Sequence, residues 1–175
     1  MAKLKILFVC LGNICRSPLA HGIMLEYIKQ YNLVDMIEVD SAGTCSYHEG
    51  SYPDKRAISV AKKYGIELEH VARKFTHDDL EYYDFILAMD HLNYEDVVNC
   101  EKKKKLLRKV FRLRSFESDS NENYDVPDPY YGTDSDFDDV FMICNRSISG
   151  FLNFLIDQKL LHLAVKVNPL HYSSN

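Results

Sequence analysis

The sequence predicts an α/β fold in which a parallel sheet is wrapped by helices. Short runs of near-continuous hydrophobicity alternate along the chain with segments of helical period. The apolar runs lack a polar face, which is typical of strands covered on both sides. No internal repeat or low-complexity linker divides the 175 residues, so a single domain is expected. We place this domain at residues 1–163 and predict a flexible tail over residues 164–175.

The strands and helices are expected in alternating order. Apolar runs of strand length cover residues 4–9, 37–40, 85–89 and 106–110. Residues 17–31, 54–64 and 91–100 have helical patterns, and Gly65 is a plausible cap after the second helix. A last helix is expected over residues 135–163. Residues 117–135, which include Pro127, Pro129 and Gly132, are predicted to form one long loop, and such loops are often functional.

Composition excludes several classes of protein. The net charge of −5 argues against a nucleic-acid binder, and the run Lys102 to Lys105 is predicted to be a solvated helix end. No apolar run approaches the roughly 20 residues that cross a bilayer, so no integral membrane association is expected. The five cysteines are an odd number and follow no signal peptide, which favours a cytoplasmic location. No Cys-x2-Cys or His-x3-His spacing occurs, so neither a metal nor another cofactor is expected.

The first apolar run leads directly into a candidate anion-binding loop. Cys10 ends the run, and Arg16, Ser17 and Pro18 follow after five residues that include Gly12. A loop that closes at a helix start directs backbone N–H groups inward, and a guanidinium binds two phosphate oxygens at once. The same field stabilises a thiolate. In a chain of this composition Cys-x5-Arg-Ser arises by chance only about 0.015 times, so the pattern predicts a phosphate site around a nucleophilic Cys10.

A thiolate that attacks a phosphomonoester needs a proton donor for the leaving group and a base for the water that follows. One carboxyl group can perform both tasks. Asp128 is the best candidate, because Pro127 and Pro129 stiffen the backbone around it and two tyrosines follow. On the residues alone, a solvated acidic turn is the more common explanation of an aspartate in such a loop.

Three motifs together resemble the low-molecular-weight protein tyrosine phosphatases. They are Cys10-Leu-Gly-Asn-Ile-Cys-Arg-Ser-Pro18, Asp40-Ser-Ala-Gly-Thr44 and Asp128-Pro-Tyr-Tyr-Gly132, and the likeness spans residues 4 to about 160. The resemblance implies a doubly wound, four-stranded parallel sheet with the phosphate loop after its first strand. It also implies a metal-free phosphatase without a cofactor. His21 is a departure, because the family more often has an acid at that position.

The resemblance also implies a role for each matching residue. Cys10 matches the nucleophile, Arg16 the phosphate clamp and Asp128 the acid and base. The phosphate-binding loop corresponds to Leu11, Gly12, Asn13, Ile14, Cys15, Arg16 and Ser17. The Ser17 hydroxyl matches the group that hydrogen-bonds the thiolate, and Asn13, Ser41 and His70 match a network that supports the loop. Tyr47, Tyr130 and Tyr131 match the aromatic walls, and Cys15 is expected to form a reversible disulfide with Cys10 under peroxide.

Phosphotyrosine-containing proteins are therefore the expected substrates, and phosphate or arsenate-like anions the expected ligands. Four alternatives remain open from the sequence. Ser17 could be no more than the N-cap of the first helix. Arginine phosphatases resemble this loop but carry Thr where this chain has Ile14. Arsenate reductases share the loop but use paired downstream cysteines, whereas Cys100 and Cys144 lie far apart. A phosphotyrosine-binding module without activity would have no use for a proton donor.

Overall fold

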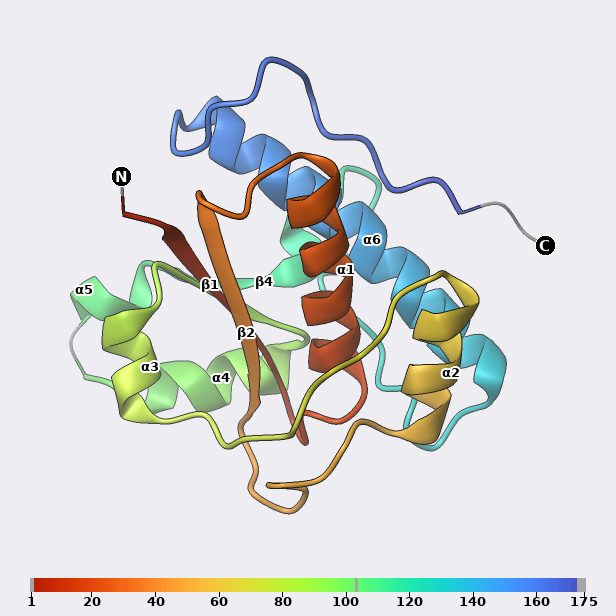
Figure 1. Ribbon diagram of the computed structural model, residues 1–175. Coiled ribbons are helices and arrows are strands. Elements are labelled where there is room, and N and C mark those ends of the chain that lie inside the picture. Colours follow the sequence, from red (N-terminus) through yellow and green to blue (C-terminus); the bar gives the residue numbers. More distant parts are fainter. Residues whose placement is uncertain (1, 103, 173–175) are drawn as a thin grey trace.

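A computed structural model describes residues 2–102 and 104–172 of the chain. Its elements follow one another as β1 (Leu4–Cys10), α1 (Arg16–Gln30), β2 (Ile37–Gly43), α2 (Lys55–Lys63), α3 (His77–Tyr82), β3 (Phe85–Ala88), α4 (His91–Asn99), α5 (Lys104–Leu107), β4 (Val110–Arg112), the 3₁₀ helix η1 (Leu113–Phe116) and α6 (Asp134–Asp157). In the described residues the strands form one sheet in the order β2-β1-β3-β4, and all neighbouring strands are parallel. The predicted four-stranded, doubly wound α/β fold is confirmed (Figure 1).

The sheet is buried on both faces. Ile6 and Phe8 of β1 belong to a hydrophobic cluster shared with α1 and α6, whereas Leu7 and Val9 belong to a second cluster shared with α3 and α4. This division follows from the geometry of a strand, whose successive side chains point to opposite faces. All four side chains are fully buried. The continuous apolar run that predicted a strand covered on both sides therefore has that structure.

The fourth strand is the element that the sequence places wrongly. The apolar run 106–110 predicts a strand, but Leu107 ends α5 and the strand β4 covers Val110–Arg112. Leu107 packs against the cluster under α3 and α4, which uses its apolar side chain in a helix. A short apolar run has no periodicity that separates these two outcomes. Of the lysine run before it, Lys103 lies outside the described residues and Lys104 begins α5.

The long helices agree with their predicted bounds except at one end. The helices α1, α2 and α4 lie within one residue of the predicted ranges, and Gly65 follows α2 with a φ of 77°, as a helix-terminating glycine should. The last helix, α6, ends at Asp157, six residues before the predicted end. Lys159 stops it by taking a left-handed φ of 59°. The short helix α3 was not predicted, although its capping box of Thr76 and Asp79 is visible in the sequence.

The segment after α6 lies along that helix. The Val167 backbone N–H donates to Asn153, and the Leu170 N–H donates to Asn145 Oδ1, while both Val167 and Leu170 are buried. Asn145 Nδ2 donates in return to the Leu170 carbonyl at 3.0 Å. The sequence predicts a flexible tail from residue 164, whereas polar side chains of α6 pair with the backbone of this segment. Residues 173–175 lie outside the described part of the chain.

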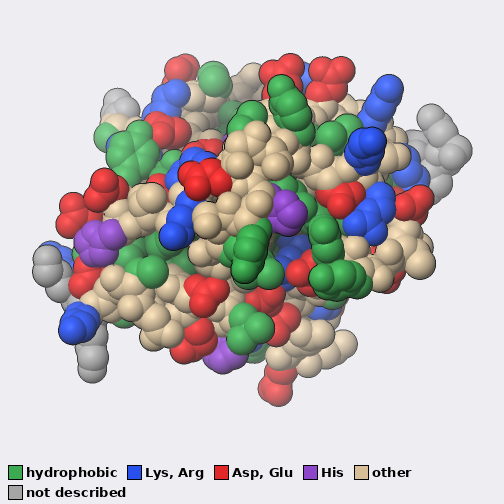
Figure 2. All heavy atoms as spheres, turned by 90° about the horizontal axis from the view of Figure 1, so that it is seen from below, with side chains coloured by type: hydrophobic (Ala, Val, Ile, Leu, Met, Phe, Trp, Pro, Cys, Tyr) green, Lys and Arg blue, Asp and Glu red, His purple; other side chains and the backbone are tan. Residues whose placement is uncertain are grey.

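The strands all end at the same edge of the sheet, and the loops there are the natural place for a ligand. Figure 2 views the molecule from that edge and shows hydrophobic side chains gathered with a histidine near its centre. Within the described residues, no helix combines the length and hydrophobicity that a membrane span requires.

Candidate active site

The loop between β1 and α1 is held against the end of β2. A Cβ added to Gly43 would stand 2.8 Å from the Leu11 carbonyl oxygen and 3.1 Å from the Asn13 nitrogen, so only glycine permits this approach. The Cys45 N–H donates to the Leu11 carbonyl at 2.9 Å. Asn13 takes a left-handed φ of 56°, which Asn tolerates better than most residues. The loop is therefore tightly turned before the first helix begins.

Cys10 lies at the bottom of a pocket of about 500 Å³. Its side chain is 2 % exposed. The Asn13 backbone N–H donates to Sγ at 3.2 Å, and the Ser17 hydroxyl lies 3.0 Å from the same atom. These two hydrogen-bonding groups hold the sulfur in one position within the loop.

A buried polar network supports the loop from behind. Asn13 Nδ2 donates to Ser17 Oγ at 2.8 Å and to Ser41 Oγ at 3.0 Å. Asn13 Oδ1 accepts from His70 Nε2 at 2.8 Å and from the Arg73 backbone N–H at 3.0 Å. The structure thus brings together all the residues for which the sequence predicts a supporting role. Ser17 is not the N-cap of α1, since Cys15 holds that position.

Arg16 is a buried guanidinium between two carboxylates. Nη1 donates to Asp90 at 2.5 Å and Nη2 donates to Asp128 at 3.1 Å. Nη1 also donates to the Val126 carbonyl at 3.2 Å. The Asp128 side chain is 44 % exposed and lines the same pocket as Cys10. The candidate clamp and the candidate proton donor, which are 112 residues apart in the sequence, therefore meet over the same pocket.

Aromatic rings form the walls of the pocket. Tyr47 and Tyr131 are almost fully exposed, and Tyr130 packs edge-on against Tyr131 with 4.9 Å between the ring centroids. The three tyrosines line the pocket together with Ile14, Cys45 and His48. Such walls give the aromatic ring of a ligand a surface on which to stack, within a pocket that also contains Cys10.

Four residues of the site were not predicted from the sequence. Asp90, which pairs with Arg16, lies two residues after the end of β3, and its place near the carboxyl end of a strand could have marked it. Cys45 and His48 line the pocket without a local sequence signal. Arg56 donates to the Tyr130 carbonyl at 2.9 Å and to the Gly132 carbonyl at 3.3 Å, which holds the loop after Asp128.

Cys15 is buried and lines the same pocket as Cys10. Burial, with the nearby charge of Asp54 and of Cys10, raises the pKa of the Cys15 thiol to about 12. The thiol is therefore neutral at neutral pH. All five cysteines of the chain are free, so Cys10 and Cys15 are both present as thiols.

The fold and the site define a class of protein. A parallel sheet delivers a cysteine into a loop that leads into a helix, and a buried arginine and an aspartate share the pocket above the sulfur. This combination characterises α/β proteins that bind phosphate at a cysteine-centred loop.

Comparisons with known proteins identify the family. The sequence profile of the low molecular weight phosphotyrosine protein phosphatases matches residues 5–161. The Homo sapiens low molecular weight phosphotyrosine protein phosphatase is 40 % identical over 152 residues, which cover 86 % of this chain and 95 % of that protein. The chain belongs to the low molecular weight phosphotyrosine protein phosphatase family.

Solved structures agree with this family and add a second activity to consider. A protein tyrosine phosphatase from Entamoeba histolytica is 36 % identical and superposes with a TM-score of 0.84, covering 91 % of this chain and 100 % of that chain. A Drosophila arginine phosphatase is 30 % identical with a TM-score of 0.80, covering 86 % of this chain and 97 % of that one. The fold is therefore shared by enzymes named for two different phosphorylated residues.

Proposed function

We propose that this protein hydrolyses phosphotyrosine in proteins, and small aryl phosphates, through a phosphate ester on Cys10. One observation carries the proposal. The sulfur of Cys10, the guanidinium of Arg16 and the carboxylate of Asp128 share one pocket, whose walls are tyrosine rings. Membership of the family supports the same reaction. Inorganic phosphate and arsenate are expected to bind in the pocket as competing anions.

In the first step the Cys10 thiolate attacks phosphorus and the bond from phosphorus to the phenolic oxygen breaks. Arg16 and the N–H groups of the loop bind the remaining phosphate oxygens and stabilise the charge that develops on them. Protonated Asp128 gives its proton to the departing phenolate. The Arg16 guanidinium 3.1 Å from Asp128 places the donor near the phosphate that the same arginine binds.

In the second step a water molecule attacks the phosphocysteine and Asp128 accepts its proton. The bond from phosphorus to sulfur breaks, which releases inorganic phosphate and restores the thiolate. Ser17 assists this step, because a hydroxyl 3.0 Å from Sγ stabilises the charge that returns to the sulfur. Asn13 fixes the orientation of that hydroxyl from its other side.

The proposal includes the cytoplasmic setting that the sequence predicts, since the reaction needs Cys10 as a free thiolate and a reducing compartment keeps it so. Phosphoarginine is the second candidate substrate, because an arginine phosphatase is among the solved structures with this fold. Ile14 argues for phosphotyrosine, since its apolar side chain lines the pocket where arginine phosphatases carry Thr.

Hydrolysis of para-nitrophenyl phosphate at mildly acidic pH, with a chelator present throughout, tests the reaction. We expect activity in the parent protein, none in Cys10→Ser, and parental activity in Cys100→Ser, which replaces an exposed thiol outside the pocket. Activity that survives in Cys10→Ser would exclude the thiol mechanism. An inactive, reduced parent protein would leave arsenate reduction and phosphotyrosine binding as the functions to test.

The role of Asp128 is tested with leaving groups of different basicity. Asp128→Asn should slow hydrolysis of phenyl phosphate about 10²–10⁴-fold and that of para-nitrophenyl phosphate much less, because a good leaving group needs no proton. Equal losses for both substrates would remove Asp128 from the acid role.

The substrate is tested by measuring how fast the parent and Ile14→Thr proteins hydrolyse phosphotyrosine and phosphoarginine peptides. A parental preference for phosphoarginine would overturn the assignment.

A further inference from the structure

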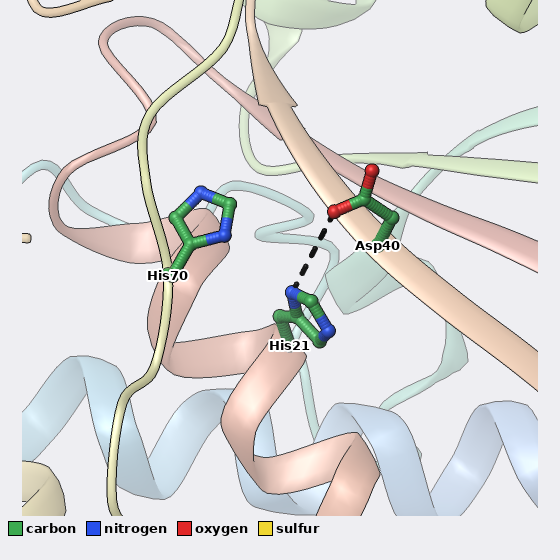
Figure 3. A group of neighbouring side chains, drawn as sticks. All are labelled: His21, Asp40 and His70. Atoms are coloured by element: carbon green, nitrogen blue, oxygen red, sulfur yellow. Dashed lines mark ion pairs between the residues drawn. The ribbon is translucent and has the colours of Figure 1, made fainter. Parts of the chain in front are cut away.

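Three potential metal ligands meet outside the pocket. His21 comes from α1, Asp40 from β2 and His70 from the segment between α2 and α3, and their side chains converge in Figure 3. One ligand atom from each residue lies within 4.8 Å of the other two. The distance from His21 Nδ1 to Asp40 Oδ1 is 3.9 Å. All three residues are half-buried, so an ion can reach them from solvent.

We propose that His21, Asp40 and His70 bind a divalent transition-metal ion, with Zn²⁺ as the best match. Two imidazole nitrogens and one carboxylate oxygen are ligands that Zn²⁺ accepts, whereas Mg²⁺ and Ca²⁺ prefer sites made of oxygen alone. Ligands at tetrahedral positions about 2.1 Å from Zn²⁺ lie about 3.4 Å apart. The observed separations therefore need to close by only about 1 Å, which side-chain rotation supplies, and water completes the coordination.

The ligand atoms of His70 and Asp40 are available because the other partners of these two residues bind elsewhere on the same side chain. His21 Nδ1 lies 3.5 Å from Ser41 Oγ, and an ion would take the place of this long contact. His70 donates to Asn13 through Nε2, and Figure 3 shows its other ring nitrogen turned toward His21 and Asp40. Asp40 receives Arg73 and Tyr83 on Oδ2, and its Oδ1 faces His21. The carboxylate is thus divided between an existing ion pair and the proposed site.

The protonation state of the two histidines also favours an ion. Burial lowers the pKa of His21 to about 4 and lowers the pKa of His70 as well. Both imidazoles are therefore neutral at neutral pH and carry a lone pair that a metal can accept. The Arg73 guanidinium 2.9 Å from Asp40 opposes a second positive charge, so we expect a moderate affinity.

The shortest link from the site to the phosphate loop is the hydrogen bond between His70 and Asn13, 2.8 Å long. A metal on the nitrogen of His70 that faces Asp40 leaves the proton on Nε2, which is the atom that donates to Asn13. Asn13 in turn bonds to Ser17 and Ser41. A bound ion would hold His70 in the tautomer that the loop requires, so we expect it to stabilise the folded protein. The ion takes no part in the reaction proposed above.

Zn²⁺ binding is measured by calorimetry in a buffer free of phosphate and chelator. We expect one ion per chain in the parent protein and in Cys10→Ser. His21→Gln should weaken binding at least about tenfold, since even an outer-shell partner contributes that much to metal affinity. His162→Gln is the matched control, because it removes an exposed histidine outside the cluster and should bind like the parent. At 100 times Kd, Zn²⁺ should raise the melting temperature of the parent by about 5–10 °C.

Several results would overturn the proposal. One is the absence of binding by the parent protein, and another is binding that Cys10→Ser abolishes but His21→Gln retains, which would place the ion on the thiols.

The imidazole NMR signals of the parent provide a test without a variant at the site. Zn²⁺ should shift the signals of His21 and His70 and leave that of His162 unchanged. A shift confined to other histidines would contradict the site. These readouts report the ion and not the reaction, so they are independent of the proposed function.

Discussion

Replacing Asn13 with Ala should both destabilise the protein and slow its reaction. The Asn13 side chain makes four hydrogen bonds, two as donor to Ser17 and Ser41 and two as acceptor from His70 and Arg73. A buried hydrogen bond contributes about 1 kcal/mol. The left-handed φ of 56° costs Ala about 1 kcal/mol more than it costs Asn. We expect Asn13→Ala to lower the free energy of unfolding by about 4–6 kcal/mol.

Two variants separate the backbone from the side chain. Asn32 has nearly the same φ, 55°, but is exposed, so Asn32→Ala should cost only about 1 kcal/mol. Asn13→Gly relieves the backbone and still loses the hydrogen bonds, so it should be about 1 kcal/mol more stable than Asn13→Ala. Urea unfolding at neutral pH measures all three against the parent.

Activity provides the second readout. A displacement of about 1 Å in the loop costs roughly 10²-fold in turnover, so we expect kcat for para-nitrophenyl phosphate to fall by about that factor in both Asn13 variants. Asn32→Ala should retain parental kcat. The reasoning fails if Asn13→Ala is no less stable than Asn32→Ala, because the network around Asn13 would then contribute nothing to the loop.

Further predictions concern packing, the thiols and pH. A Cβ at Gly150 would stand 1.9 Å from the Phe116 carbonyl oxygen, so Gly150→Ala should lower stability by about 1–3 kcal/mol in urea unfolding. Burial raises the pKa of Cys15 to about 12, so mass spectrometry should find that iodoacetate at pH 7 labels Cys10 before Cys15; the reverse order would contradict this. Peroxide should join the two thiols reversibly, and Cys15→Ser should then recover less activity with reductant than the parent. Burial lowers the pKa of His21 to about 4, so the unfolded chain takes up a proton first as pH falls below 6.5. Folded stability should therefore decline by about 2–3 kcal/mol between pH 6.5 and 4, and His21→Gln should lack this decline.

The first half of the candidate site could be predicted because it is continuous in the sequence. Cys10, Arg16 and Ser17 lie within eight residues, and a strand followed by a helix fixes where such a segment must lie. Their type and order alone indicate an anion bound beside a thiol. The partners of these residues were harder to find. His70 was assigned only through the resemblance to a family. Asp128 was a candidate from its neighbouring prolines and tyrosines, and the resemblance favoured it over a solvated acidic turn.

The sequence could not predict the structure or role of residues that are compatible with two different local structures. The apolar run around Leu107 fits a strand or a short helix, and the packing of Leu107 against the cluster shared with α3 and α4 decided the outcome. Asp90 is the N-cap of α4, and only the approach of Arg16 from α1 makes it part of the site. The docking of Leu170 depends on Asn145, a polar residue in the middle of an apolar helix face.

The sequence by itself determined the class of fold and the chemistry of the loop, because hydrophobic period and the residues from Cys10 to Ser17 act locally. Only the tertiary structure decided which distant side chains reach that loop. It brought Asp128 to Arg16, and it gathered His21, Asp40 and His70 from three separate elements. Such meetings depend on how helices pack on a sheet, and packing is a property of the whole chain rather than of any segment of it.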